Sequence, residues 1–142
     1  MKKSIKFLYY FVLLISTLVG LWHFFVPKIF KWYDYLPMEY KNLIVGIDWT
    51  NYCFSIFLFG LSLLLIILGK KVLSLKGESV YFYFFLTFVW GFRTALAIFI
   101  EPWPLQPIPA AAIGQLCASI IIFVIMLIVS IVFVKSMKNN KL

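Results

Sequence analysis

The longest apolar segment of the chain spans residues 110–134 and reads AAAIGQLCASIIIFVIMLIVSIVFV. It contains no charged residue, and Gln115 is its most polar member. A helix of about 20 apolar residues is long enough to cross the hydrocarbon core of a bilayer. The segment therefore predicts a transmembrane helix, and it indicates an integral membrane protein.

Three further segments meet the same criterion, at about residues 7–26, 45–68 and 80–100. The chain of 142 residues is 64% hydrophobic and only 13% charged, whereas a soluble domain is about half apolar and a quarter charged. These figures exclude a water-soluble globule and a disordered chain. We expect an all-α fold in which residues 1–142 form a single transmembrane domain, a bundle of four membrane-spanning helices.

The first predicted span follows a basic flank of Lys2, Lys3 and Lys6, which is also typical of a cleaved signal peptide. Its apolar run extends to Val26 and is longer than the apolar region of most signal peptides. No small-residue cleavage site follows it. We therefore expect this segment to remain in the protein as a true span.

The distribution of basic residues predicts the orientation of the bundle. The chain has 13 Lys and Arg against five Asp and Glu, a net charge of +8. With four spans, both ends of the chain and the middle connection lie on one side. The positive-inside rule assigns that side to the cytoplasm, which predicts a multi-pass cell-membrane protein with both termini cytoplasmic. The lysines of this side are Lys2, Lys3, Lys6, Lys70, Lys71, Lys76, Lys135, Lys138 and Lys141, against Lys28, Lys31 and Lys41 on the other.

Membrane topology explains the excess of positive charge, together with attraction to anionic lipid headgroups. A nucleic-acid-binding protein needs a folded basic face with groove-reading or base-stacking elements, and four spans leave no room for one. We therefore expect membrane lipids as partners and no nucleic acid. A membrane-protein partner or a second copy of the chain remains a possible partner as well.

The two connections on the predicted outer side contain prolines and interfacial residues. Aromatic and lysine side chains in the first favour a short interfacial helix or turn around Ile29–Tyr35, ended by Pro37. The second is predicted to form a rigid, extended cap because prolines cannot continue a helix. Its prolines are Pro102, Pro104, Pro107 and Pro109.

The charged residues of the predicted spans lie in the outer half, together with one histidine and one glutamine. They are His23, Asp48, Arg93, Glu101 and Gln115. Ionisable groups inside a bilayer are costly and usually mark functional positions. Residues three and four apart share a helix face, and on that basis each span carries one polar stripe. If the four stripes face inward, they form a polar pocket open to the outside. The predicted ligand-binding residues are His23, Asp48, Asn51, Trp90, Arg93, Thr94, Glu101 and Gln115.

Each charged residue also has a purely structural interpretation. Asp48 and Arg93 can form an ion pair that holds the second and third spans together, because intramembrane charges usually pair with one another. His23 can hydrogen-bond a neighbouring helix without binding a ligand. Glu101 can be a solvated residue at a helix end.

Several kinds of catalytic site have no counterpart in the sequence. Cys53 and Cys117 are not part of a C-x-x-C pair, so no dithiol redox motif is present, and we expect both to be buried free thiols. One histidine without nearby Cys or Asp ligands predicts no metal site, and it can supply at most one axial haem ligand. No phosphate-binding glycine loop or nucleophile motif occurs. Catalytic residues and cofactors therefore remain unknown.

The end of the first span carries a pattern of a known family. Residues 20–30 read GLWHFFVPKIF, followed by Pro37 and by an acidic residue, Asp48, early in the second span. This resembles the DoxX-like family of small four-helix membrane proteins, in which Gly-x-x-His-Phe-x-x-Pro-x-x-Phe often ends the first span. The family more often has Glu where this chain has Asp48. The resemblance covers the first two spans and implies the four-helix fold; some members are subunits of quinone-linked oxidoreductases.

Three functions remain open. The first is a non-catalytic protein whose outward-facing pocket binds an amphipathic small molecule (a lipid, an isoprenoid or a quinone) or a partner helix. There, Asp48 fixes Arg93, which binds the ligand, while Trp49 and Trp90 pack its apolar part. The second is a membrane enzyme or electron-transfer subunit with His23 and Asp48 as a proton relay. The third is an oligomeric channel or transporter.

Overall fold

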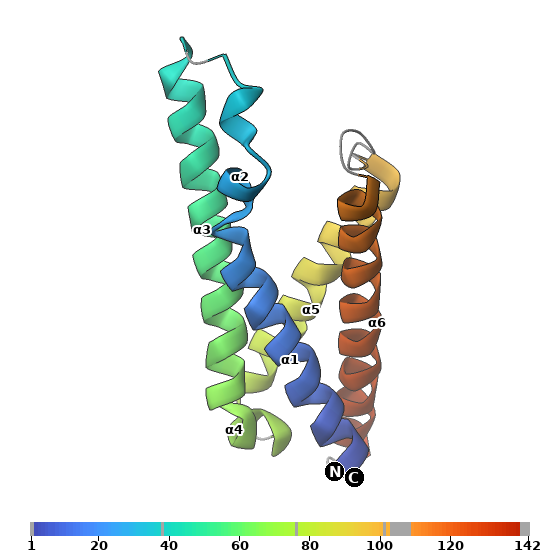
Figure 1. Cartoon of the computed structure of the whole chain (residues 1–142). Helices are drawn as coiled ribbons and strands as arrows, with labels where there is room; N and C mark the ends of the chain where they lie inside the picture. The colour runs from blue at the N-terminus through green and yellow to red at the C-terminus, as the bar shows by residue number, and fades with distance from the viewer. Residues whose placement is uncertain (1, 38, 76, 101, 103–108, 140–142) are drawn as a thin grey trace.

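In the computed structural model the protein is all-α, with four long helices (Figure 1). The structure describes residues 2–37, 39–75, 77–100, 102 and 109–139. The long helices are α1 (Lys3–His23), α3 (Lys41–Ile67), α5 (Ser79–Ala95), which continues as a π-helical turn η2 (Leu96–Ile100), and α6 (Pro109–Asn139). Each is long and apolar enough to cross a membrane, so the chain is a small four-span membrane protein.

Three short helices lie in the connections: α2 (Val26–Ile29), η1 (Trp32–Asp34) and α4 (Gly69–Leu73). A short interfacial helix or turn was predicted around Ile29–Tyr35, and the structure has two short helices in this connection, α2 and η1. The division falls at Lys31, whose backbone is left-handed with φ of 49°, a conformation that a continuous right-handed helix excludes. The predicted proline cap of residues 102–109 lies largely outside the described residues.

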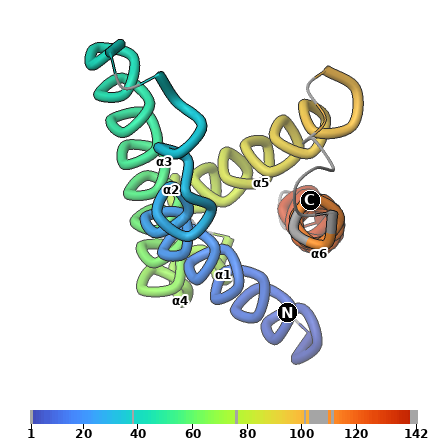
Figure 2. The backbone as a smooth tube through the Cα atoms, turned by 45° about the horizontal axis from the view of Figure 1, so that its top comes forward, coloured from blue at the N-terminus to red at the C-terminus, as the bar shows by residue number. Residues whose placement is uncertain are grey.

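Helices α1 and α5 cross between α3 and α6. Helix α1 contacts α6 and then α3, while α5 contacts α4 and α3 and then α6 (Figures 1 and 2). Both chain termini lie at one end, which we call the terminal end. At the opposite end α3 diverges from α5 and α6, and we call this the splayed end.

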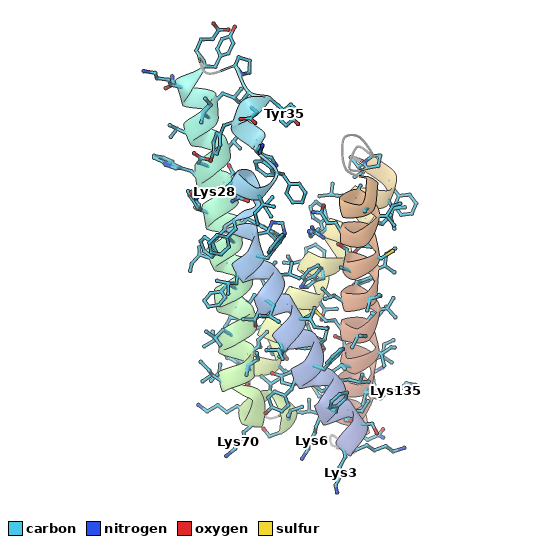
Figure 3. All side chains as sticks on the ribbon, in the orientation of Figure 1. Lys3, Lys6, Lys28, Tyr35, Lys70 and Lys135 are labelled. Carbon is cyan, nitrogen blue, oxygen red and sulfur yellow. The ribbon has the colours of Figure 1, made fainter. Side chains whose placement is uncertain are left out.

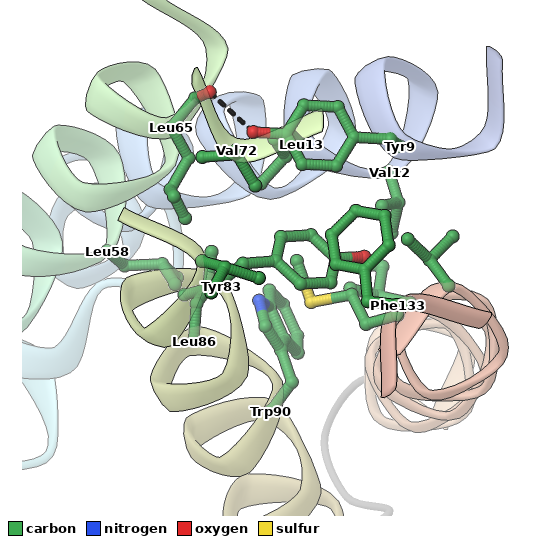
Figure 4. Packing of buried hydrophobic residues seen from close by; sticks show 14 residues of the cluster. Tyr9, Val12, Leu13, Leu58, Leu65, Val72, Tyr83, Leu86, Trp90 and Phe133 are labelled. Atoms are coloured by element: carbon green, nitrogen blue, oxygen red, sulfur yellow. Dashed lines mark hydrogen bonds between the residues drawn. The ribbon is translucent and has the colours of Figure 1, made fainter. Parts of the chain in front are cut away.

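The buried core occupies the terminal half of the bundle. The rings of Tyr9, Tyr83 and Phe133 meet there with centroids 5.2 Å (Tyr9–Tyr83) and 5.3 Å (Tyr83–Phe133) apart, and the Tyr9 hydroxyl donates to the Leu65 carbonyl at 2.6 Å (Figure 4). Interdigitated side chains therefore close this half. The other core residues are Val12, Leu13, Leu58, Val72, Val80, Leu86, Trp90, Ile122, Met126 and Val129.

A polar contact joins three helices within this core. The Ser16 hydroxyl lies 2.8 Å from the Ser62 hydroxyl and accepts from the Trp90 indole N–H at 2.9 Å. One turn further along α1, a Cβ on Gly20 would lie 2.5 Å from the Phe59 backbone nitrogen. Glycine is thus required for the close approach of α1 and α3, and the bundle is tied together just below the splayed end.

Candidate binding cleft

Three cavities of about 370, 530 and 560 Å³ lie where the helices diverge. The largest two lie on the α3 side and on the α5–η2 side, and the smallest lies between α1 and α6. His23 and Gln115 line all three, while Arg93 and Ser119 line two of them. We call this shared region, defined by His23, Arg93, Gln115 and Ser119, the cleft. Its cavities have the volumes usual for small-molecule sites.

The cleft contains one charged side chain, Arg93, among the residues that the structure describes. The Arg93 guanidinium donates to the Ser119 hydroxyl, and its central carbon lies 5.4 Å from the centroid of the Trp90 ring. The Ser119 hydroxyl in turn donates to the Gln115 carbonyl at 2.8 Å. Arg93 is therefore held between α5 and α6 by an aromatic face and a single hydroxyl.

His23 is the last residue of α1 and is half-buried. Its carbonyl accepts from the Asn51 side-chain amide at 3.0 Å, and its imidazole meets the Phe54 ring edge-on at 5.3 Å between centroids. Asn51 is only 8% exposed and lines the cavity on the α3 side. This contact fixes the end of α1 against α3 and satisfies a carbonyl that the helix leaves unpaired.

Asp48 does not form the expected ion pair with Arg93 between the described side chains. Its carboxylate instead accepts from the Tyr33 hydroxyl at 2.6 Å, and Asp48 lines none of the three cavities. The physical reason is the divergence of α3 from α5, which leaves Asp48 beside η1 rather than beside Arg93. The hydrogen bond to Asp48 is the main cause that raises the pKa of Tyr33 to about 12.

The structure brings only part of the predicted site together. His23, Trp90, Arg93 and Gln115 line one cavity, and Asn51 lines the adjoining one. Thr94 is buried, donates within α5 to the Trp90 carbonyl, and lines none of the three cavities. Glu101 lies outside the described residues. The ligand-binding roles of these residues remain predictions.

The expected burial of the two cysteines is wrong, and Trp49 lies outside the cavities. Trp49, predicted to pack the apolar part of a ligand, is 71% exposed and lines none of the three cavities. Cys53 and Cys117 are free thiols, but both are exposed rather than buried. Neither cysteine lines any of the three cavities.

The predicted ligand-binding residues did not include the residues that form the walls of the cleft. The α6 wall consists of Ala110, Gly114 and Ala118, and a Cβ on Gly114 would meet no atom within 4 Å. The opposite wall comes from Val19, Trp22 and Val26 of α1 and α2. The four-residue spacing of these small residues puts them on one helix face, and this spacing is the signal that the sequence offered.

The described part of the chain contains no group of three or more His, Cys, Asp or Glu side chains able to hold a metal ion. No protein-family model, curated protein or solved structure matches this chain. The resemblance to the DoxX-like family therefore stays a prediction, and function has to be argued from the cleft.

Proposed function

We propose that this four-span membrane protein binds an amphipathic small molecule (a lipid, an isoprenoid or a quinone) in the cleft. The observation that carries the proposal is the convergence of three cavities on the same two polar residues, His23 and Gln115. Small-molecule sites combine apolar walls with a few polar groups that fix orientation, and the cleft has both.

The composition of the walls supports an amphipathic ligand over a purely polar one. Carbon-rich side chains and small residues face each other across the smallest cavity, from Val19, Trp22 and Val26 to Ala110 and Gly114. The polar groups of Arg93, Gln115 and Ser119 lie together on α5 and α6. An acyl or isoprenoid chain fits the first surface and a head group the second, whereas cavities of this size are small for a partner helix.

The charge distribution supports an orientation in which the cleft opens to the outside. Lys3, Lys6, Lys70 and Lys135 all lie at the terminal end (Figure 3), and basic residues favour the cytoplasmic side. In this orientation the packed core lies in the cytoplasmic half of the bilayer, and the cleft lies in the outer half. A ligand would then enter from the outer leaflet.

A cavity-filling substitution tests the proposal. Gly114→Leu places a side chain in the space beside α6, where a Cβ would meet no atom within 4 Å. Gly60→Leu on α3 is its matched control, because a Cβ there also meets nothing within 4 Å and Gly60 lines none of the three cavities. The probes are palmitate and hexadecanol, each carrying a photoreactive diazirine. We expect crosslinking to peptides of α1 and α6 in the wild type and in Gly60→Leu, and its loss in Gly114→Leu. Equal labelling of all three proteins, or labelling confined to outward faces, would contradict the proposal.

A further inference from the structure

We infer that the head group of the cleft ligand is an oxyacid anion, a carboxylate or a phosphate, held by Arg93. This inference rests on the proposed amphiphile site and narrows its ligand. It selects fatty acids and phosphorylated lipids or isoprenoids over neutral quinones and over cationic amphiphiles.

The first argument is the incomplete pairing of Arg93. A guanidinium carries five N–H donors, and among the residues of the described structure only the Ser119 hydroxyl accepts from it. Arg93 lies seven residues before Ile100, roughly 10 Å from the outer end of the helix at 1.5 Å per residue. At that depth a charge without a counter-ion is costly, so an anion in the cleft would stabilise the site.

The second argument is the charge balance of the lining. No described residue that lines the three cavities is a carboxylate, and Asp48 is held by Tyr33 outside them. Gln115 and His23 add an amide and an imidazole beside Arg93, and both groups have N–H donors. A cation would be repelled, and a neutral head group would leave the charge of Arg93 uncompensated.

The third argument is geometric. The planar guanidinium fork matches carboxylate and phosphate oxygens in a bidentate manner, and Trp90 and Ser119 fix its position. The smallest cavity, which Arg93 lines, is also lined by Gly114 and Ala118 of α6 and by Val19 and Val26 of α1 and α2. An anion on Arg93 would therefore have space beside it for the attached chain.

The test compares three ligands with the same hexadecyl chain: palmitate, hexadecyl phosphate and hexadecanol. Equilibrium binding is measured to the full-length protein in nanodiscs of uncharged (zwitterionic) phosphatidylcholine. We expect at least one anion to bind about tenfold or more tightly than the alcohol, because hydrogen bonds to charged groups are stronger than neutral ones. A preference for palmitate would identify a free fatty acid as the source, and a preference for hexadecyl phosphate would identify a phosphorylated lipid.

Two variants, Arg93→Gln and Lys28→Gln, distinguish anion binding in the cleft from nonspecific attraction of anions to the positive charge of the protein. Lys28 is an exposed cation on α2 (Figure 3), so Lys28→Gln is expected to keep the preference for anions, whereas Arg93→Gln is expected to abolish it while hexadecanol still binds. A preference that survives in Arg93→Gln would overturn the inference. Equal affinities of the wild-type protein for all three ligands would also overturn the inference. That result would leave the proposed amphiphile site standing. Failure of all three to bind would instead contradict the proposed function itself.

Discussion

Two hydroxyl groups hold Asp48 and Arg93 in place at the splayed end. Tyr33 donates to the Asp48 carboxylate, and the Ser119 hydroxyl accepts from the Arg93 guanidinium. The two contacts belong to separate parts of the structure, since Asp48 joins α3 to η1 and Arg93 joins α5 to α6. Each charge therefore has its own hydroxyl partner, and the two can be tested independently.

The titration of Tyr33 tests the first contact. Asp48 raises the pKa of Tyr33 from 10.0 to about 12 because the neutral phenol donates to the carboxylate. The contact therefore contributes its full stability below pH 10 and loses it as the pH rises through about 12. We expect Asp48→Asn to move the midpoint of the Tyr33 titration back toward pH 10. The titration is followed by tyrosinate absorbance, and the part of the signal that Tyr33→Phe removes belongs to Tyr33. An unchanged midpoint in Asp48→Asn would show that the carboxylate does not accept this hydrogen bond.

Sequence alone identified the residue types of the site but not their partners. Hydropathy and helical spacing place Asp48 and Arg93 in the same half of the bilayer, which made an ion pair the simplest expectation. Whether they meet depends on the crossing of α3 and α5, and a hydrophobic pattern does not encode a crossing angle. The role of Ser119 as the hydrogen-bond partner of Arg93 follows only from the packing of α5 on α6.

At the level of helices, the close approach of α1 to α3 depends on Gly20. A methyl group there would meet the backbone of Phe59, which cannot move aside as a side chain can. We expect Gly20→Ala to destabilise the bundle by about 1–3 kcal/mol through overpacking, measured by reversible unfolding in detergent. Gly60→Ala on the open face of α3 is the control and should be close to neutral. Equal stabilities of the two variants would mean that the two helices do not meet at Gly20.

The hydroxyl of Ser16 links α1, α3 and α5. Ser16→Ala removes the acceptor of the buried Trp90 indole N–H and the partner of Ser62. We expect a loss of about 1 kcal/mol, the usual size of an interhelical hydrogen bond in a membrane protein, measured by the same unfolding assay. Thr50→Ala is the control, since the Thr50 hydroxyl donates within its own helix to the Gly46 carbonyl. A Ser16→Ala variant as stable as Thr50→Ala would contradict the three-helix contact.

The long helices were predictable because each apolar run is long enough to cross a bilayer and is bounded by lysines or prolines. The predicted end of the last span at Val134 falls short of the observed end at Asn139, because helical hydrogen bonds continue past the apolar run. The break between α2 and η1 was not predictable, since the left-handed backbone of Lys31 is imposed by the return of the chain toward α3.

At the scale of the whole molecule, the bundle is closed at one end and hollow at the other. Packed aromatic and aliphatic side chains fill the terminal half (Figure 4). The three cavities that meet at the cleft lie in the splayed half. The described core therefore offers ions no polar path through one copy of the chain. This arrangement favours a binding pocket over a pore within a single copy.

The orientation of the bundle predicts where its two ends lie in the cell. The basic residues Lys3, Lys6, Lys70 and Lys135 gather at the terminal end, which favours the cytoplasmic side. We therefore expect a reporter protein that fluoresces only in the cytoplasm to fluoresce when it is fused to either terminus. A protease added to intact cells should leave both reporters uncut. Cleavage of either reporter from outside would reverse the orientation and would open the cleft to the cytoplasm.

The most direct test of the account is an experimental structure of the protein in lipid, examined beside Arg93. The account predicts an elongated non-protein density between α1 and α6, with its head within hydrogen-bond distance of the Arg93 guanidinium and its chain passing Gly114. The same structure of Gly114→Leu should lack this density. Direct packing of α1 against α6 with the cleft closed, or an Arg93 paired with a carboxylate of the chain itself, would contradict the central claim that the splayed end is a binding site.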